Sequence, residues 1–420
     1  MSNSVAAASR RPADQPPPGS RALRSSGRAA WHRRVGALPL GYLAAIVVAG
    51  FVHPFIPEWR WLLIHLLLLG AATNAIVIWS THFANAVLRV PPPPNRHGQT
   101  MRLTALNLGV VAVLAGGLGG AAWHPLAVAG AGLVFAAVLA HLLVLASRLR
   151  RALSPPLVVT VHYYLVAGAA LLVGIPAGAW MVVVDDRAPV LLFHAHVNVL
   201  GWITLTVLGT LLTLWPTVLR TRMPSGAVRW VTRALPLACA GLVLLGVGVL
   251  AWWPAVAVAG MVGFAGAAAV SIVPAVMAGR RSPPSSFAAW SIVAAIGWLF
   301  VALGIDTIGL VKADDPASAV AGFGGVLIPL LAGFVAQVLI GSLAYLLPMV
   351  LGGGPARVRA RQAMLDRHWP QRVVMGNTAL AVFLLPVGSY VRITTSLLVL
   401  AALVQFLVAA VRAVMVDRRS

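Results

Sequence analysis

Long apolar segments alternate with short polar loops along most of this 420-residue chain. Hydrophobic residues make up 60% of the sequence and charged residues 10%, a balance that excludes an ordinary soluble domain. Each segment is long enough, or nearly so, to cross a hydrocarbon core of roughly 30 Å as a helix that rises 1.5 Å per residue. We therefore expect an all-α polytopic membrane protein with twelve transmembrane helices. The segments are expected at residues 38–57, 59–83, 103–122, 125–147, 157–182, 190–219, 229–252, 254–278, 287–311, 320–350, 373–390 and 392–416.

The first 37 residues differ from the rest of the chain. They are rich in Arg, Ser and Pro, and they hold no apolar run that would make a cleavable signal peptide. We expect residues 1–37 to be a disordered basic cytoplasmic tail, and residues 38–420 to form one twelve-helix transmembrane domain.

Positive charge is concentrated in alternate loops. The loops after the even-numbered segments carry Arg89, Arg148 and Arg280 among other arginines. The loops after the odd-numbered segments carry Glu58 and Asp186 with few bases. Because cytoplasmic loops carry an excess of Lys and Arg, we expect both termini to be cytoplasmic in a bacterial inner membrane. The same pattern explains the net charge of +22 by topology, so membrane lipid rather than nucleic acid is the expected partner.

Two histidines, His194 and His196, lie one residue apart within the sixth segment. Histidine inside a membrane span is costly and commonly marks a functional site. Positions two apart on an α-helix point about 200° away from each other, so the two imidazoles should face sites on opposite sides of the helix. This arrangement suits a helix that lies between two prosthetic groups, with haem, with or without copper, as the first candidate.

An internal repeat relates the second and sixth segments. His65 is followed five residues later by Gly70, and His196 is followed five residues later by Gly201. Gly341 occupies the corresponding place in the tenth segment, which lacks the histidine. The spacing predicts three pseudo-repeats of four helices each.

The repeat places His65 and His196 at one depth, about six residues or roughly 9 Å from the outer ends of their helices. Two imidazoles at one level on separate helices can ligate a haem from both sides. We therefore expect His65 and His196 to bind one low-spin haem, and His194 to face a second haem or a metal. The lone Cys239 excludes a CxxC attachment motif, so the haem is expected to be b-type. The alternative is that each imidazole is a hydrogen-bonded core histidine.

Twelve spans, a histidine near the outer end of the second and a His-x-His stretch resemble subunit I of the haem–copper oxidases. They are equally similar to the NnrS-type haem–copper membrane proteins and to the membrane domain of bacterial proteins labelled "copper oxidase". In the oxidases the first imidazole of His-x-His ligates the high-spin haem, and the second ligates the low-spin haem together with the second-helix histidine. The resemblance implies that His194 is a high-spin-type ligand and that His65 and His196 are the low-spin pair, with copper as a candidate second metal.

The sequence departs from the oxidase pattern in its motifs. His-x-His lies on the sixth span here and on the tenth in the oxidases, and only the three-fold repeat reconciles the two. The chain has no His-His pair and no His-Pro-Glu-Val-Tyr stretch, the elements that hold the oxidase copper and its redox tyrosine. Proton-pumping oxygen reduction is therefore not expected.

Four other polar residues inside the apolar segments are expected to be structural. Asn74, Asn198 and Gln337 are expected to make interhelical hydrogen bonds. Asp306, near the outer end of the ninth segment, is expected to act as a cap or to be solvated at the interface. A proton relay or a propionate contact through water is the alternative role of this carboxylate.

The expected function is redox chemistry, or the handling of nitric oxide, oxygen or copper, by a haem-binding membrane protein with an unknown electron donor. A proton-coupled secondary transporter is the competing class, because twelve spans, internal repeats and intramembrane histidines suit it too. A haem or copper assembly factor without turnover is the third. The sequence does not decide between an enzyme and a carrier.

Overall fold

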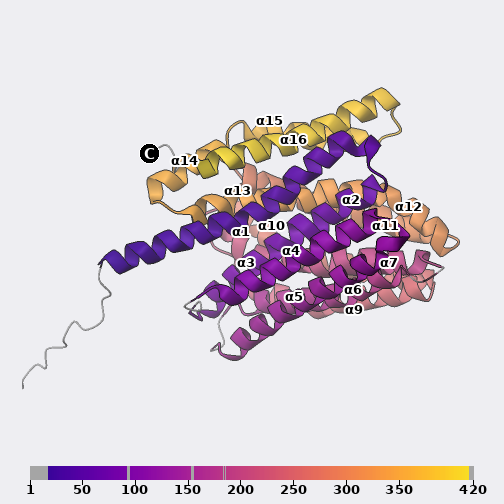
Figure 1. Cartoon of the computed structure of the whole chain (residues 1–420), viewed down its shortest axis with the longest axis horizontal. Coiled ribbons are helices and arrows are strands. Elements are labelled where there is room, and N and C mark those ends of the chain that lie inside the picture. The colour runs from indigo at the N-terminus through magenta and orange to yellow at the C-terminus, as the bar shows by residue number, and fades with distance from the viewer. Residues whose placement is uncertain (1–17, 92–94, 153–155, 183, 185, 416–420) are drawn as a thin grey trace, which may run out of the picture.

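The computed structural model describes residues 18–91, 95–152, 156–182, 184 and 186–415. Within this part of the chain all regular structure is helical, and eleven helices are long and apolar enough to span a membrane. The helices lie side by side along one axis and form a single bundle (Figure 1). Val243, Val262 and Val311 are among the many large apolar side chains exposed on its outer helices, where a soluble protein would carry polar groups. The chain is therefore an all-α, multi-pass membrane protein.

The first four spans come from the first third of the chain. Residues 18–37 of the expected disordered tail form the first part of helix α1, where Ala, Arg and Leu favour the helical conformation. Residues 1–17 of that expected tail lie outside the described residues. The elements are α1 (Pro18–Val52), η1 (His53–Phe55), α2 (Trp59–His65), η2 (Leu66–Ala72), α3 (Thr73–Leu88), α4 (His97–Leu118), η3 (Ala121–Trp123) and α5 (His124–Arg150).

The middle third contains the His-x-His stretch, at the end of α7. Its span, Ala188–Val218, is the most buried candidate span, with 78% of its most apolar stretch inside the protein. Such burial fits a helix at the centre of the bundle, surrounded by other helices and shielded from lipid. The elements are α6 (Val159–Trp180), α7 (Ala188–His196), η4 (Val197–Thr204), α8 (Leu205–Val218), α9 (Ala227–Leu250) and α10 (Pro254–Arg281).

The last third departs from expectation at one segment. In place of the crossing expected at 373–390, the structure has the 15-residue helix α15, which is too short to count among the eleven candidate spans. It rises roughly 22 Å at 1.5 Å per residue. Even so, α15 runs beside α16, and the start of α1 and the end of α16 lie at the same end of the bundle (Figure 1). The elements are α11 (Phe287–Lys312), α12 (Pro316–Ile328), η5 (Pro329–Ala336), α13 (Gln337–Leu351), α14 (Pro355–Leu365), α15 (Trp369–Phe383) and α16 (Ser389–Met415).

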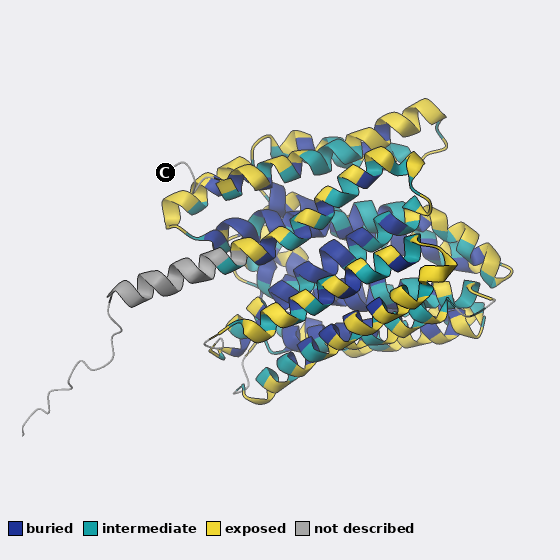
Figure 2. Cartoon of the chain, in the orientation of Figure 1, coloured by how far each residue is buried: buried dark blue, intermediate teal, exposed yellow. Residues whose placement is uncertain are grey.

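The second, sixth and tenth spans share an unusual backbone. Each is interrupted by a π-helical turn: η2 in Trp59–Leu88, η4 in Ala188–Val218 and η5 in Pro316–Leu351. Figure 2 shows that buried residues concentrate in the middle of the bundle, where these spans run, whereas exposed residues cover the outer helices. Short π-helical turns inside α-helices occur frequently at functional sites.

Two threonines stabilise the first two π-helical turns in the same way. The Thr73 hydroxyl donates to the Leu68 carbonyl (2.8 Å), and the Thr204 hydroxyl donates to the Val199 carbonyl (2.9 Å). In both cases the acceptor lies five residues earlier, and the two threonines have the same separation as the two repeat glycines. The hydroxyls thus bind backbone groups inside the π-helical turns.

Candidate functional site

The two histidines of the sixth span face opposite sides of their helix, as the sequence predicts. The His194 Nδ1 lies 2.9 Å from the Gly174 carbonyl oxygen of α6. The His196 Nε2 lies 2.8 Å from the Asp306 Oδ2 of α11. One span therefore carries one imidazole toward the fifth span and the other toward the ninth.

Backbone carbonyls fix the tautomers of His65 and His194. The Nδ1 of His65 lies 2.8 Å from the Trp61 carbonyl oxygen, just as the Nδ1 of His194 lies beside the Gly174 carbonyl. A carbonyl oxygen can only accept, so each Nδ1 carries the proton and donates it. Each neutral imidazole then has a lone pair on Nε2, and no described residue makes a hydrogen bond to either Nε2. This is the form in which histidine ligates a metal while its other nitrogen donates to a carbonyl.

The structure pairs His65 with a different partner from the one expected. The His65 and His194 rings lie close enough for their charges to interact, whereas the electrostatic partner of His196 is Asp306. The imidazole that neighbours His65 is therefore that of His194, whereas His196 contacts Asp306. The reason is that His196 lies on the face of the sixth span that packs on α11 and α12, away from the second span. Which histidines ligate a haem stays a prediction.

A glycine makes room for the His194 ring. A methyl group on Gly178 of α6 would come within 2.7 Å of the His194 Cε1, so only glycine at this position leaves the ring where it lies. On the other helix, the Trp61 ring packs against the His65 ring with a centroid separation of 4.2 Å. Both imidazoles are thus held in place by direct contacts as well as by their Nδ1 hydrogen bonds.

His196 and Asp306 form a buried pair, with side-chain exposures of 3% and 9%. The His196 Nδ1 lies 2.6 Å from the Leu192 carbonyl oxygen and must donate to it. One further proton then lies between the two side chains, either on Nε2 of an imidazolium or on the Asp306 carboxyl. The expected role of Asp306 as a cap or a solvated interfacial group is therefore wrong, because its partner is the imidazole of another span.

The other polar residues behave largely as expected. The Asn107 amide donates to Asn74 across the second and third spans (2.8 Å), and the Gln337 amide donates to Asn377 of α15 (2.9 Å). These bonds confirm interhelical roles for Asn74 and Gln337. The prediction for Asn198 is wrong, because its amide donates to a carbonyl one turn earlier in its own helix (2.8 Å).

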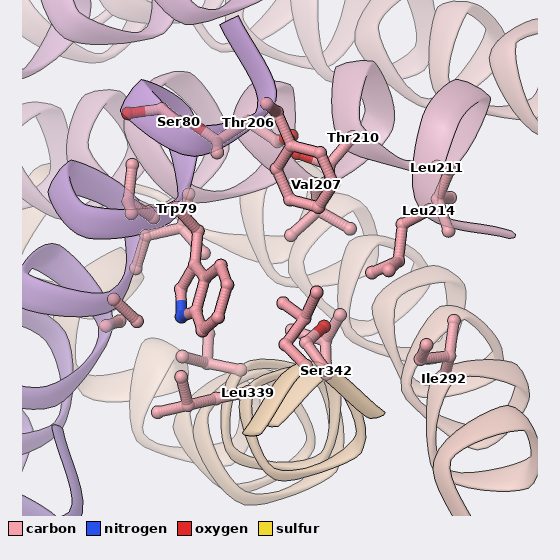
Figure 3. A pocket seen from close by; sticks show the side chains of 18 residues that line it. Trp79, Ser80, Thr206, Val207, Thr210, Leu211, Leu214, Ile292, Leu339 and Ser342 are labelled. Atoms are coloured by element: carbon pink, nitrogen blue, oxygen red, sulfur yellow. The ribbon is translucent and has the colours of Figure 1, made fainter. Parts of the chain in front are cut away.

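A cavity of about 90 Å³ lies between the second, sixth and tenth spans (Figure 3). Its walls are mainly apolar, with Trp79 on one side and the hydroxyls of Ser80, Thr206, Thr210 and Ser342 around it. In the second and sixth spans the lining residues come after His65 and His196, so the cavity lies deeper in the bundle than the imidazoles. No histidine lines it.

No protein family matches the sequence, and no curated protein is detectably similar to it. Among the described residues, no three His, Cys, Asp or Glu side chains gather as ligands for a metal ion. The donor set beside the second span consists of two imidazoles. That number matches the two axial ligands of a six-coordinate haem iron.

Proposed function

We propose that this protein binds a b-type haem between His65 of the second span and His194 of the sixth. The observation that carries the proposal is that each Nδ1 is bonded to a backbone carbonyl while each Nε2 has no partner among the described residues. Haem bound through these atoms would supply one-electron redox chemistry. His65 and His194 hold it, and Gly178 leaves space for the His194 ring.

We further propose a number of crossings and an orientation in the membrane. The chain crosses a bacterial inner membrane twelve times, with α15 as a short crossing and both termini in the cytoplasm. The three π-helical spans are equivalent members of three four-helix repeats, and an electron donor that we do not identify reduces the haem. The start of α1 and the end of α16 lie at one end of the bundle, and this position and the matched threonines support the arrangement.

Optical spectra of the purified, haem-supplied protein test the proposal. We expect sharp α and β bands in the reduced protein, and loss of these bands in His65→Ala and in His194→Ala. The matched control is the double variant His196→Leu with Asp306→Leu, which removes both members of the buried pair and leaves no unpaired charge. This control should keep the bands.

The opposite results would overturn the proposal. A protein with full haem supply and no Soret absorbance binds no haem. Retention of the bands in His65→Ala or His194→Ala would exclude that residue as a ligand. If the same two imidazoles bind copper in place of haem, metal analysis should detect copper and the spectrum should lack a Soret band.

The His196–Asp306 pair favours a second candidate function, proton-coupled secondary transport. The pair keeps one proton between two buried groups without net charge, which is what a proton-carrying site inside a membrane needs. A substrate that shifts this proton between the imidazole and the carboxyl would couple its own binding to the protonation of the pair. A haem or copper assembly factor would use His65 and His194 without this coupling.

Infrared difference spectroscopy across a pH step tests the second candidate. A proton-carrying pair should show a carboxyl carbonyl band that appears or disappears with pH in the wild-type protein and is absent in Asp306→Asn. If the wild-type protein shows no Asp306-dependent band at any pH at which it stays folded, the pair is a fixed structural ion pair.

A further inference from the structure

A second cluster of nitrogen-bearing side chains lies between α3, α4 and α5, away from the imidazoles described above. His141 of α5 is 1% exposed, and its Nε2 lies 3.0 Å from the Ser80 hydroxyl of α3. The guanidinium groups of Arg102 and Arg148 both interact electrostatically with the His141 ring. The two guanidinium groups also interact with each other.

The packing of α4 against α5 explains why these residues meet. The two helices touch at Gly109, where an added methyl group would come within 2.8 Å of the Gly130 carbonyl oxygen. Because the helices are antiparallel, the part of α4 that lies two turns before Gly109 is opposite the part of α5 near His141. Arg102 lies at that point of α4, and Arg148 follows His141 by two turns on the same face of α5.

The cluster contains polar atoms without partners. The Arg102 Nε, the Arg148 Nη1 and the His141 Nδ1 are all buried and make no hydrogen bond within the described structure. Buried groups of this kind are normally satisfied, because an unpaired one costs free energy. When the Ser80 hydroxyl donates to Nε2, the His141 Nδ1 carries a proton and becomes a third donor beside the two guanidinium groups.

Within the described residues, no carboxylate neutralises these charges. The sequence holds no Asp or Glu between Glu58 and Asp185, and in the described part of the chain no carboxylate interacts with Arg102, Arg148 or His141. Two adjacent arginines repel each other, so a bound anion from outside the chain would stabilise them. A site of two guanidinium groups suits a phosphate group, which accepts several charge-assisted hydrogen bonds.

We propose that Arg102, Arg148 and His141 bind a phosphate group, carried either by an anionic lipid headgroup or by a free phosphate ion. Arg102 lies near the start of its span, which begins at His97, and Arg148 lies near the end of its span, which ends at Arg150. Both are therefore level with the headgroups of the leaflet that the arginine-rich loops face, where basic pockets between helices bind anionic lipids.

Ligand-induced thermal stabilisation of the detergent-purified protein tests the site. The probes are dioleoylphosphatidylglycerol, dioleoylphosphatidylcholine and inorganic phosphate at matched ionic strength. The test variant is Arg102→Gln with Arg148→Gln, and the control is Arg150→Gln with Arg151→Gln, which removes two exposed arginines from the same helix end. We expect phosphatidylglycerol to raise the melting temperature by several degrees more than phosphatidylcholine in the wild type and the control, and this difference to vanish in the test variant.

Native mass spectrometry of the same samples, and of a further variant, His141→Gln, counts bound lipid directly. This count does not depend on the stability of the variants. If only inorganic phosphate stabilises the wild type, and the test variant loses this effect, the site binds a soluble phosphate. If only phosphatidylglycerol does so, the site binds a lipid headgroup. Equal binding and equal stabilisation in the test variant and the control would overturn the proposal. So would the lack of any effect of either phosphate probe on the wild type.

Discussion

The Trp202 indole N–H in η4 donates to the Thr73 hydroxyl oxygen at the start of α3, over 3.1 Å. The same hydroxyl donates to the Leu68 carbonyl inside η2, so one buried side chain connects the π-helical turns of the second and sixth spans. This connection fixes the two histidine-bearing spans relative to each other. His65 and His194 both lie just before these two π-helical turns in their spans.

Replacement of Thr73 by Val should therefore destabilise the protein. The change removes both hydrogen bonds at nearly constant volume and leaves the Trp202 N–H unpaired, at a cost of about 1–3 kcal/mol. Thr206→Val is the matched control, because the Thr206 hydroxyl is buried beside the cavity and has no partner in the described structure. Thermal melting should show a lower midpoint for Thr73→Val and an unchanged or higher one for Thr206→Val. Equal midpoints would contradict this account.

The buried pair of His196 and Asp306 should show strong coupling in a double-mutant cycle. Either His196→Leu or Asp306→Leu alone leaves one unpaired buried group, and breaking such a pair costs about 3–5 kcal/mol. The double variant should be far more stable than the sum of the two single effects predicts. Denaturant or thermal unfolding of the four proteins measures the coupling, and additive losses would mean that the two side chains do not interact.

Substitution of Gly178 by Ala should displace the His194 ring without removing a ligand. The new methyl group would lie 2.7 Å from Cε1, so the ring must rotate or shift. In haem-supplied protein we expect weaker low-spin bands and a gain of carbon monoxide binding, because one axial ligand is lost. Gly132→Ala is the control, since its methyl group would meet no atom within 4 Å. Identical spectra for both variants would argue against His194 as an axial ligand.

Single introduced cysteines in a Cys239→Ala background can establish the number of crossings. We expect a thiol at residue 186 and one at residue 387, between α15 and α16, to react with an impermeant reagent from the outside. A thiol at residue 357 should react only after the cytoplasmic side is opened. Labelling at residue 387 from the cytoplasmic side alone would show that α15 does not cross the membrane.

Much of the helical architecture follows from the sequence, because apolar length alone identifies a membrane-crossing helix. Eleven of the twelve expected segments coincide with candidate spans, and the opposite directions of His194 and His196 follow from helical geometry. The segment at 373–390 is the exception. Leu384–Gly388 interrupts its helix, so α15 ends at Phe383.

The partners of the histidines could not be predicted in the same way. Helical geometry says that two side chains point apart, but which neighbour each one meets depends on the order of helices around the sixth span. The pairing of Asp306 with His196 could not be predicted from the sequence, because a single acidic residue near a helix end is equally consistent with an interfacial cap. His141 lies alone in an apolar run, and only the packing of α4 on α5 brings Arg102 and Arg148 to it.

Each π-helical turn is equivalent to an α-helix that has gained a single residue. The π-helical turn η4 begins directly after His196, between the two histidines and the rest of the sixth span. Deletion of one residue from η4 would restore the α-helix and rotate the histidine-bearing end by about 100° relative to the other half. His194 and His196 would then lose their partners together. The insertion or deletion of a single codon in η4 can therefore change the partners of His194 and His196, as a substitution can.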